Sequence, residues 1–134
     1  MSTGALNGRH ILVVDDEALL REILVDEFEG YGARVSAAAD GAEALELCRR
    51  TDFDAIVSDI RMPKMDGLAF LRQLRNETTC GAKVFVCSGF NDAEEELSRL
   101  DVVDVFPKPF DIVALANRVI DALGEAKPRN DPVD

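Results

Sequence analysis

The chain has 134 residues, of which 47% are hydrophobic and 31% are charged, a balance typical of one globular domain and not of a disordered chain. Fifteen Lys and Arg against 26 Asp and Glu give a net charge of −11, which disfavours binding to nucleic acid or to an anionic membrane surface. No apolar run reaches the ~18–20 residues of a membrane span, and the first residues show no signal-peptide pattern, so we expect no membrane association.

Strand-like and helix-like segments alternate along the chain. Four apolar runs have strand length, and a fifth, more polar run is typical of an edge strand. The four apolar runs cover residues 10–14, 54–57, 83–87 and 102–106, and the edge run covers residues 33–38. Runs that are apolar on both faces are typical of parallel strands with helices on both sides of the sheet.

A segment with helical periodicity follows each of these runs. The clearest is the last, whose apolar residues recur at helical spacing over 112–123, and the weakest lies at about 91–99. Asp40, Asp66 and Asp111 are predicted helix N-caps, with Glu43 completing a capping box. The pattern predicts a flavodoxin-like, doubly wound α/β fold, (βα)5, with a five-stranded parallel sheet in the order 2-1-3-4-5.

The domain is expected to span residues 9–123. Residues 1–8 are expected to be a flexible N-terminus, and residues 124–134 a flexible tail or the start of a linker. The three cysteines, Cys48, Cys80 and Cys87, form no CxxC pair, which argues against a disulfide framework and a zinc site. They favour a reducing, cytoplasmic setting, with Cys48 and Cys87 buried as small apolar residues.

Polar residues follow the predicted strands where each one ends. Asp15 and Asp16 follow the first strand, Asp59 the third and Ser88 the fourth, and Lys108 follows the fifth. In open α/β sheets, ligands bind at this edge, near the point where the strand order reverses. Crowded carboxylates without a His or thiolate ligand favour Mg²⁺, with Mn²⁺ acceptable. A metal beside a lysine and a hydroxyl suits phosphoryl transfer, and an aspartate can itself accept the phosphoryl group.

Four motifs carry a family resemblance. They are VVDDE at 13–17, DIRMPKMDG at 59–67, CSG at 87–89 and KPF at 108–110. Together, in this order and at the ends of these strands, they resemble the receiver domain of bacterial two-component response regulators of the chemotaxis-regulator type. The resemblance covers roughly residues 9–123. It implies a phosphoprotein of a two-component system or phosphorelay that acts in signal transduction.

The resemblance implies a role for each matching residue. Asp59 would be the phosphoacceptor. Asp15, Asp16 and Asp59 would hold Mg²⁺ together with the backbone carbonyl of Arg61. Lys108 would pair with the phosphoryl oxygens.

Further residues of the motifs have switching or structural roles. Ser88 would move to hydrogen-bond the phosphoryl group, and Pro109 would follow a cis peptide bond. Asp66 and Gly67 are interpreted as structural, forming a turn and a helix N-cap.

One position departs from the family pattern. Receivers of this type usually carry an aromatic residue three positions before the lysine, which turns inward as the Ser or Thr moves. Here that position is Val105, and the aromatic residue, Phe106, comes one position later. Strand alternation predicts that Val105 and Phe106 point to opposite faces, so the switch formed with Ser88 is expected to differ from the usual one.

The implied function is a signalling domain and not an enzyme in the ordinary sense, since it catalyses only its own phosphorylation and dephosphorylation. The implied phosphodonor is a sensor histidine kinase or a histidine phosphotransfer protein. The implied target is a downstream protein or a C-terminal output domain outside this chain. The oligomeric state is left open, with a homodimer as one alternative.

Three alternatives remain at this stage. A receiver-like interaction module could signal without phosphorylation. A phosphohydrolase with an aspartyl nucleophile would need an acid two residues after Asp59, where the chain has Arg61. A flavodoxin-like cofactor protein would need a phosphate-binding loop after the first strand, where the chain has acids that repel phosphate.

Overall fold

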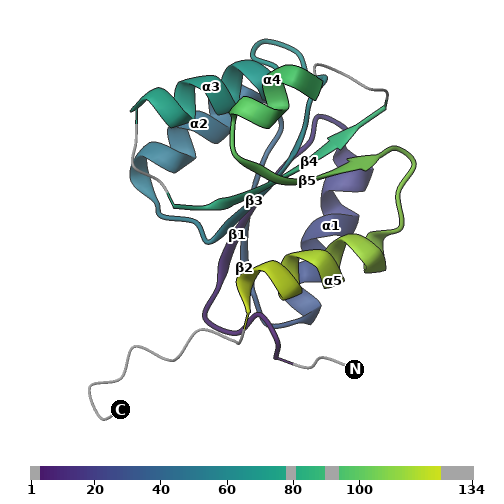
Figure 1. Cartoon of the computed structure of the whole chain (residues 1–134). Coiled ribbons are helices and arrows are strands. Elements are labelled where there is room, and N and C mark those ends of the chain that lie inside the picture. The colour runs from purple at the N-terminus through teal and green to yellow at the C-terminus, as the bar shows by residue number, and fades with distance from the viewer. Residues whose placement is uncertain (1–3, 78–80, 90–93, 125–134) are drawn as a thin grey trace.

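The computed structural model describes residues 4–77, 81–89 and 94–124, and within them five parallel strands alternate with five helices (Figure 1). The strand order is β2-β1-β3-β4-β5, as predicted. The strands are β1 His10–Val14, β2 Arg34–Ala38, β3 Ala55–Asp59, β4 Lys83–Ser88 and β5 Val102–Pro107. The helices are α1 Ala18–Gly30, α2 Gly41–Arg50, α3 Gly67–Glu77, α4 Glu94–Arg99 and α5 Ile112–Leu123. None of the helices in these ranges is long and apolar enough to cross a membrane.

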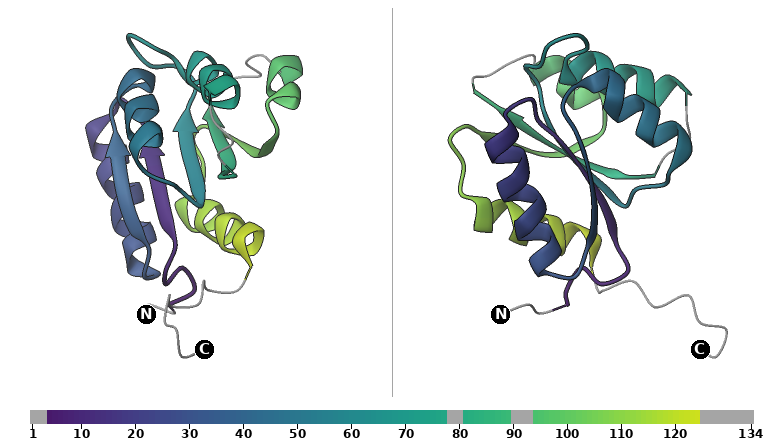
Figure 2. Two further views of the ribbon diagram at one scale, coloured as in Figure 1. Left: turned by 90° about the vertical axis from the view of Figure 1, so that its left-hand side faces the viewer. Right: turned by 180° about the vertical axis from the view of Figure 1, so that it is seen from behind.

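Helices cover both faces of the sheet, as the apolar strands require. Helices α2, α3 and α4 pack on one face and α1 and α5 on the other, and Figure 2 shows the sheet between these two layers. Alternate residues of β1 and β3 supply the two cores. Leu12, Val14 and Ile56 face the α2–α3–α4 layer, whereas Ile11, Val13 and Val57 face the α1–α5 layer. The central strands are therefore buried on both sides, and their ends are fixed in space.

The predicted helix caps are present. Asp40, Asp66 and Asp111 each accept a backbone N–H hydrogen bond from the first turn of the helix that follows, at 2.8 to 3.1 Å. The Glu43 carboxylate accepts from the Ala39 amide at 2.8 Å and so completes the reciprocal half of the capping box. The weak helix predicted at 91–99 is described from Glu94 onward, and residues 91–93 lie outside the described residues.

The amino-terminal segment differs from its prediction. Residues 4–8, expected to be flexible, form a turn in which Leu6 is fully buried in the α1–α5 core. The Leu6 amide donates to the Tyr31 carbonyl at 2.9 Å. The physical reason is that Leu6 is a large apolar side chain whose burial against the core is favourable. Residues 1–3 and 125–134 lie outside the described residues, as does Cys80, whereas Cys48 and Cys87 are buried as predicted.

Strand β5 has an irregularity that affects which face of the sheet Val105 and Phe106 point to. The pairing between β4 and β5 shifts register by one residue and skips Val103. After the shift, Asp104 pairs with Arg118 of α5 at 3.2 Å, and Phe106 packs against the α1–α5 core. Val105 is 40% exposed. The predicted placement of Val105 and Phe106 on opposite faces is confirmed.

Gly67, at the start of α3, allows two backbone segments to approach closely. Its amide donates to the Ile60 carbonyl at 2.7 Å. A Cβ atom at this position would lie 2.2 Å from the backbone oxygen of Asp59, far inside van der Waals contact. Gly67 therefore lets α3 pack against the end of β3, next to the Asp59 side chain.

We expect Gly67→Ala to lower the free energy of unfolding by about 2 kcal/mol or more, because the new methyl group meets backbone that cannot rotate away. Gly30→Ala is the matched control, since Gly30 ends α1 and has no atom within 4 Å of the added Cβ. The control should be neutral or slightly stabilising, because Ala is a better helix former than Gly. Urea denaturation measures both, and equal stability of the two variants would contradict the steric account.

Candidate functional site

The carboxyl ends of four neighbouring strands bring the predicted polar residues to one edge of the sheet. Asp15 follows β1 directly, and Asp59 and Ser88 are the last residues of β3 and β4. Lys108 follows β5. Val14 pairs with Ser58 across β1 and β3, so Asp15 and Asp59 emerge side by side. The structure therefore brings together the residues that the sequence analysis expected to meet.

Three carboxylates form an acidic cluster at this edge. The cluster comprises Asp15, Asp16 and Asp59, each with a carboxylate oxygen within 4.8 Å of the others. Asp15 is 2% exposed and Asp59 6% exposed, whereas Asp16 lies at the surface. The Asp59 Oδ1 atom accepts from the Ile60 amide at 2.7 Å. The cluster thus has two buried members with fixed positions and one exposed member that faces solvent.

Lys108 is the cation of this edge. Its Nζ atom donates to Asp59 Oδ2 at 3.0 Å and lies 3.5 Å from Asp15 Oδ2. Partial burial alone would lower the pKa of Lys108, but the hydrogen bond to Asp59 and the negative charges of Asp15 and Asp59 outweigh it and raise the pKa. The ammonium group therefore stays protonated at neutral pH and offsets part of the charge of the cluster.

The pKa of Asp15 is raised, mainly by burial. Burial raises this pKa, and the charges of Asp59 and Asp16 raise it further. The hydrogen bond from the Glu17 amide and the charge of Lys108 act in the opposite direction without cancelling the rise. The ionised cluster is therefore short of positive charge, and a cation that entered it would be bound favourably.

The donor set fits a hard divalent cation such as Mg²⁺. All three ligand candidates are carboxylates, the oxygen ligands that Mg²⁺ prefers, and the exposed side leaves room for retained water. Cys87 lies next to the cluster on β4, but burial raises the pKa of its thiol to about 12. No thiolate is therefore offered at neutral pH, and nothing in the cluster favours zinc.

The remaining predicted residues surround this cluster. Ser88 is buried, and its backbone oxygen accepts from the Lys108 amide at 2.6 Å, which ties the ends of β4 and β5 together. The peptide bond between Lys108 and Pro109 is cis, as predicted. Arg61 has an exposed side chain in the loop after Asp59, and the role of its carbonyl stays a prediction.

The loop after Asp59 is fastened at its far end. The Gly41 amide, at the start of α2, donates to the Met65 carbonyl at 2.9 Å. Lys64 has a left-handed backbone, with φ 66°, and its ammonium group lies 3.8 Å from Asp40 Oδ2. Helix α2 therefore supports the loop that carries Arg61.

Sequence reasoning missed one residue beside the site. Arg21, on α1, donates from Nη1 to the backbone oxygen of Asp15 at 2.7 Å. The available signal was a basic residue near the amino-terminal end of a predicted helix, where the helix dipole disfavours it.

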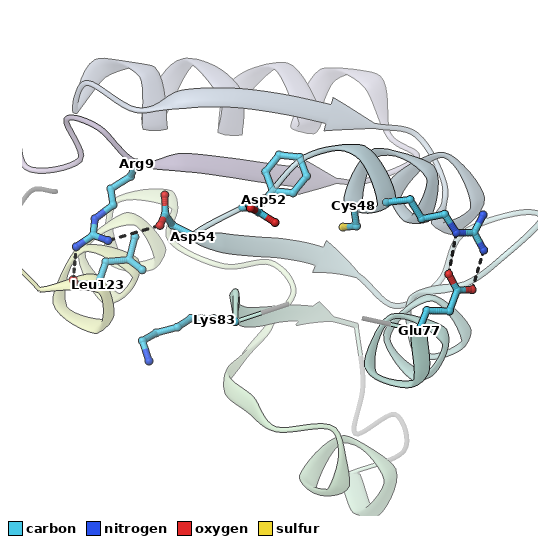
Figure 3. Close-up of a pocket in the computed structure, with 10 residues that line it drawn as sticks. Arg9, Cys48, Asp52, Asp54, Glu77, Lys83 and Leu123 are labelled. Carbon is cyan, nitrogen blue, oxygen red and sulfur yellow. Dashed lines mark hydrogen bonds and ion pairs between the residues drawn. The ribbon is translucent and has the colours of Figure 1, made fainter. Parts of the chain in front are cut away.

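A separate cavity of about 850 Å³ lies at the opposite edge of the sheet (Figure 3). Its charged groups mostly pair with one another. Arg49 forms a two-bond contact with Glu77, with N–O distances of 2.8 and 2.7 Å, and this contact holds the pKa of Glu77 at about 2. Arg9 donates to the Leu123 carbonyl at 2.7 Å and lies 3.6 Å from Asp54. The cavity contains none of the predicted site residues.

Residues 11–120 match the family model described as the response regulator receiver domain. The chain belongs to this family. The five parallel strands in the order 2-1-3-4-5 agree with this membership.

Relatives of known sequence and structure support the assignment. The receiver is 38% identical over 120 residues to "Response regulator MprA" of Mycobacterium leprae, covering 88% of this chain and 52% of that protein. The chain thus spans about half the length of the curated relatives it matches. The receiver domain of Francisella response regulator 1452 is 31% identical, with TM-score 0.77 and coverage of 87% and 96%. TrrA of Thermotoga maritima, solved in complex with Mg²⁺-BeF, is 29% identical, with TM-score 0.75 and coverage of 87% and 99%.

We expect Asp15→Asn to raise the free energy of unfolding of the receiver at neutral pH in EDTA. The raised pKa of Asp15 means that its ionised form is disfavoured in the folded state. The gain should be largest above the folded pKa and should vanish below the ordinary value of 3.8, where Asp15 is protonated in both states. The Asn side chain can still accept from the Glu17 amide.

Asp26→Asn is the control for this measurement, because it removes one negative charge from an exposed position of α1. Urea denaturation over a range of pH measures both variants. A gain for Asp15→Asn no larger than that for Asp26→Asn would contradict the burial argument.

Proposed function

We propose that Asp59 of this receiver accepts a phosphoryl group in a Mg²⁺-dependent reaction. The observation that supports this most directly is the position of its carboxylate. It lies within 4.8 Å of the carboxylates of Asp15 and Asp16 and 3.0 Å from the ammonium group of Lys108. A nucleophile, the ligands for a cation and a fixed positive charge therefore meet at one point, which is what phosphoryl transfer requires.

Mg²⁺ would be held by Asp15, Asp16 and Asp59, with the backbone carbonyl of Arg61 as a further ligand. When bound, it would offset the repulsion between the carboxylates and the incoming phosphoryl oxygens. All of these proposed ligand atoms are oxygens, which agrees with the all-carboxylate composition of the cluster. The relative TrrA, solved with Mg²⁺-BeF, supports the same assignment.

In the transfer step, a carboxylate oxygen of Asp59 forms a bond to phosphorus. The bond between phosphorus and the leaving atom of the phosphodonor breaks, and the leaving atom keeps the electron pair. The leaving atom is the imidazole nitrogen of a phosphohistidine or the acyl oxygen of an acyl phosphate. Lys108 Nζ, already 3.0 Å from Asp59 Oδ2, moves its hydrogen bond to a phosphoryl oxygen. Ser88, one strand away on β4, supplies a hydroxyl for another phosphoryl oxygen.

The phosphodonor in the cell would be a sensor histidine kinase or a histidine phosphotransfer protein, and the reaction would take place in the cytoplasm. The similarity to MprA, named as a response regulator, supports this setting. The signal would pass by a conformational change to a downstream protein or to an output domain. Because Val105 is exposed and Phe106 packs against the core, the change would start at Ser88 without an aromatic side chain at position 105.

We expect incubation with acetyl phosphate and Mg²⁺ to add one phosphoryl group to the receiver, measured by intact mass. The adduct should be absent in EDTA and absent in Asp59→Asn, because the amide is not a nucleophile for phosphorus. Asp26→Asn, an exposed position on α1, is the control and should be phosphorylated normally. An adduct that persists in Asp59→Asn would show that another residue is the acceptor.

We expect Asp16→Ala to weaken Mg²⁺ binding by about tenfold or more, the loss that even an outer-sphere partner of a metal ligand typically causes. Asp16 is exposed, so the fold should be retained, which a thermal melt in EDTA can check. Isothermal titration calorimetry measures the affinity, with Asp26→Ala as the control. An affinity equal to that of the wild type would remove Asp16 from the ligand set.

A further inference from the structure

The turn between β1 and α1 carries two of the three acids and is held mainly by backbone contacts. The Asp15 amide donates to the Ala38 carbonyl at 3.1 Å, and the Asp15 side chain accepts from the Glu17 amide at 2.8 Å. Glu17 is the N-cap of α1 but makes no side-chain capping bond. The carbonyl of Asp15 is instead held by the guanidinium group of Arg21, at 2.7 Å. A side chain of α1 therefore reaches back to hold the turn before it.

We propose that Arg21 is a positioning residue that orients Asp16 for Mg²⁺ binding; this inference rests on the proposed function. The carbonyl of Asp15 and the amide of Asp16 belong to one planar peptide unit. A hydrogen bond that fixes the carbonyl therefore fixes the orientation of the whole unit. Asp15 is also held in place by burial. Asp16 is exposed, so the direction of its side chain depends on the orientation of this peptide unit.

The location of Arg21 supports a specific role. It lies at the fourth position of α1, near the amino-terminal end, where the helix dipole disfavours a cation. Its guanidinium hydrogen bond is partly buried, and burying a charged group needs a compensating partner. The bond to the Asp15 carbonyl provides that partner next to the acidic cluster.

Two effects of Arg21 on Mg²⁺ affinity have opposite signs. Its positive charge repels a second cation and so lowers the affinity. Its hydrogen bond orients a ligand in advance and so raises the affinity. Removal of Arg21 therefore increases the affinity if charge dominates and decreases it if positioning dominates. The direction of the change distinguishes the two roles.

The test uses Arg21→Met, which keeps the apolar stem of the side chain but has no hydrogen-bond donor. Mg²⁺ binding is measured by isothermal titration calorimetry, and we expect the affinity to fall about tenfold. Arg21→Lys keeps the charge and a donor and should recover part of the loss. Arg50→Ala is the control for net charge, since Arg50 is exposed at the end of α2 and pairs only distantly, at 3.7 Å, with Glu46.

A second measurement separates positioning from loss of stability. Phosphorylation of Arg21→Met by acetyl phosphate should need more Mg²⁺ to reach half of its maximal rate, while the rate at saturating Mg²⁺ should stay near that of the wild type. Thermal melts in EDTA report any change in stability separately. Should Arg21→Met fail to fold, Arg21→Ala takes its place, because alanine also lacks a donor and is a good helix former, and an affinity at or above that of the wild type then overturns the inference.

The possible results are distinct. A wild-type receiver that binds no Mg²⁺ overturns both the proposed function and the role of Arg21. A wild type that binds Mg²⁺, with Arg21→Met binding it equally or more tightly, overturns the positioning role alone. A weaker Arg21→Met, a partial recovery in Arg21→Lys and an unchanged Arg50→Ala establish it.

Discussion

Within the described part of the chain, two carboxylates buried at the edge of the sheet contact one ammonium group, and the other features of the site depend on this imbalance of charge. Asp15 and Asp59 are both nearly inaccessible to water, and Lys108 contacts both. Buried charge is unfavourable unless it is compensated, and Lys108 together with the guanidinium group of Arg21 at the Asp15 carbonyl does not neutralise three acids. A bound cation would therefore stabilise this edge, and under the proposed function it would also offset the charge of an incoming phosphoryl group.

The fold holds this unfavourable arrangement through backbone contacts. Strands β1 and β3 are adjacent and buried on both faces, so the residues at their ends cannot move apart. Gly67 lets α3 pack against the backbone of Asp59, and Arg21 holds the carbonyl of Asp15 from α1. Helices on both faces of the sheet thus restrain the acidic cluster, which preorganises it for its charge partners.

Local rules were enough to predict most of the fold and which polar residues follow the ends of the strands. Apolar runs marked the strands, and Asp40, with its capping box, marked the start of α2, because both signals depend on neighbours in sequence. The register shift at Val103 was not predicted, since it lies in a run of ordinary strand formers with no glycine. The contacts of Leu6 and Arg21 were also missed, because each depends on a partner that only the folded structure identifies.

The contact between Arg9 and the last turn of α5 lies at the end of the sheet opposite the acidic cluster. Arg9, just before β1, donates to the carbonyl of Leu123, so the first strand and the last helix are joined at the amino-terminal edge of the sheet (Figure 1). Any segment attached to α5 would leave from this end, whereas the proposed phosphodonor would approach the other. Under the proposed function, a donor and an attached segment would therefore meet the domain at opposite ends of the sheet, and a signal between them would travel the length of the strands.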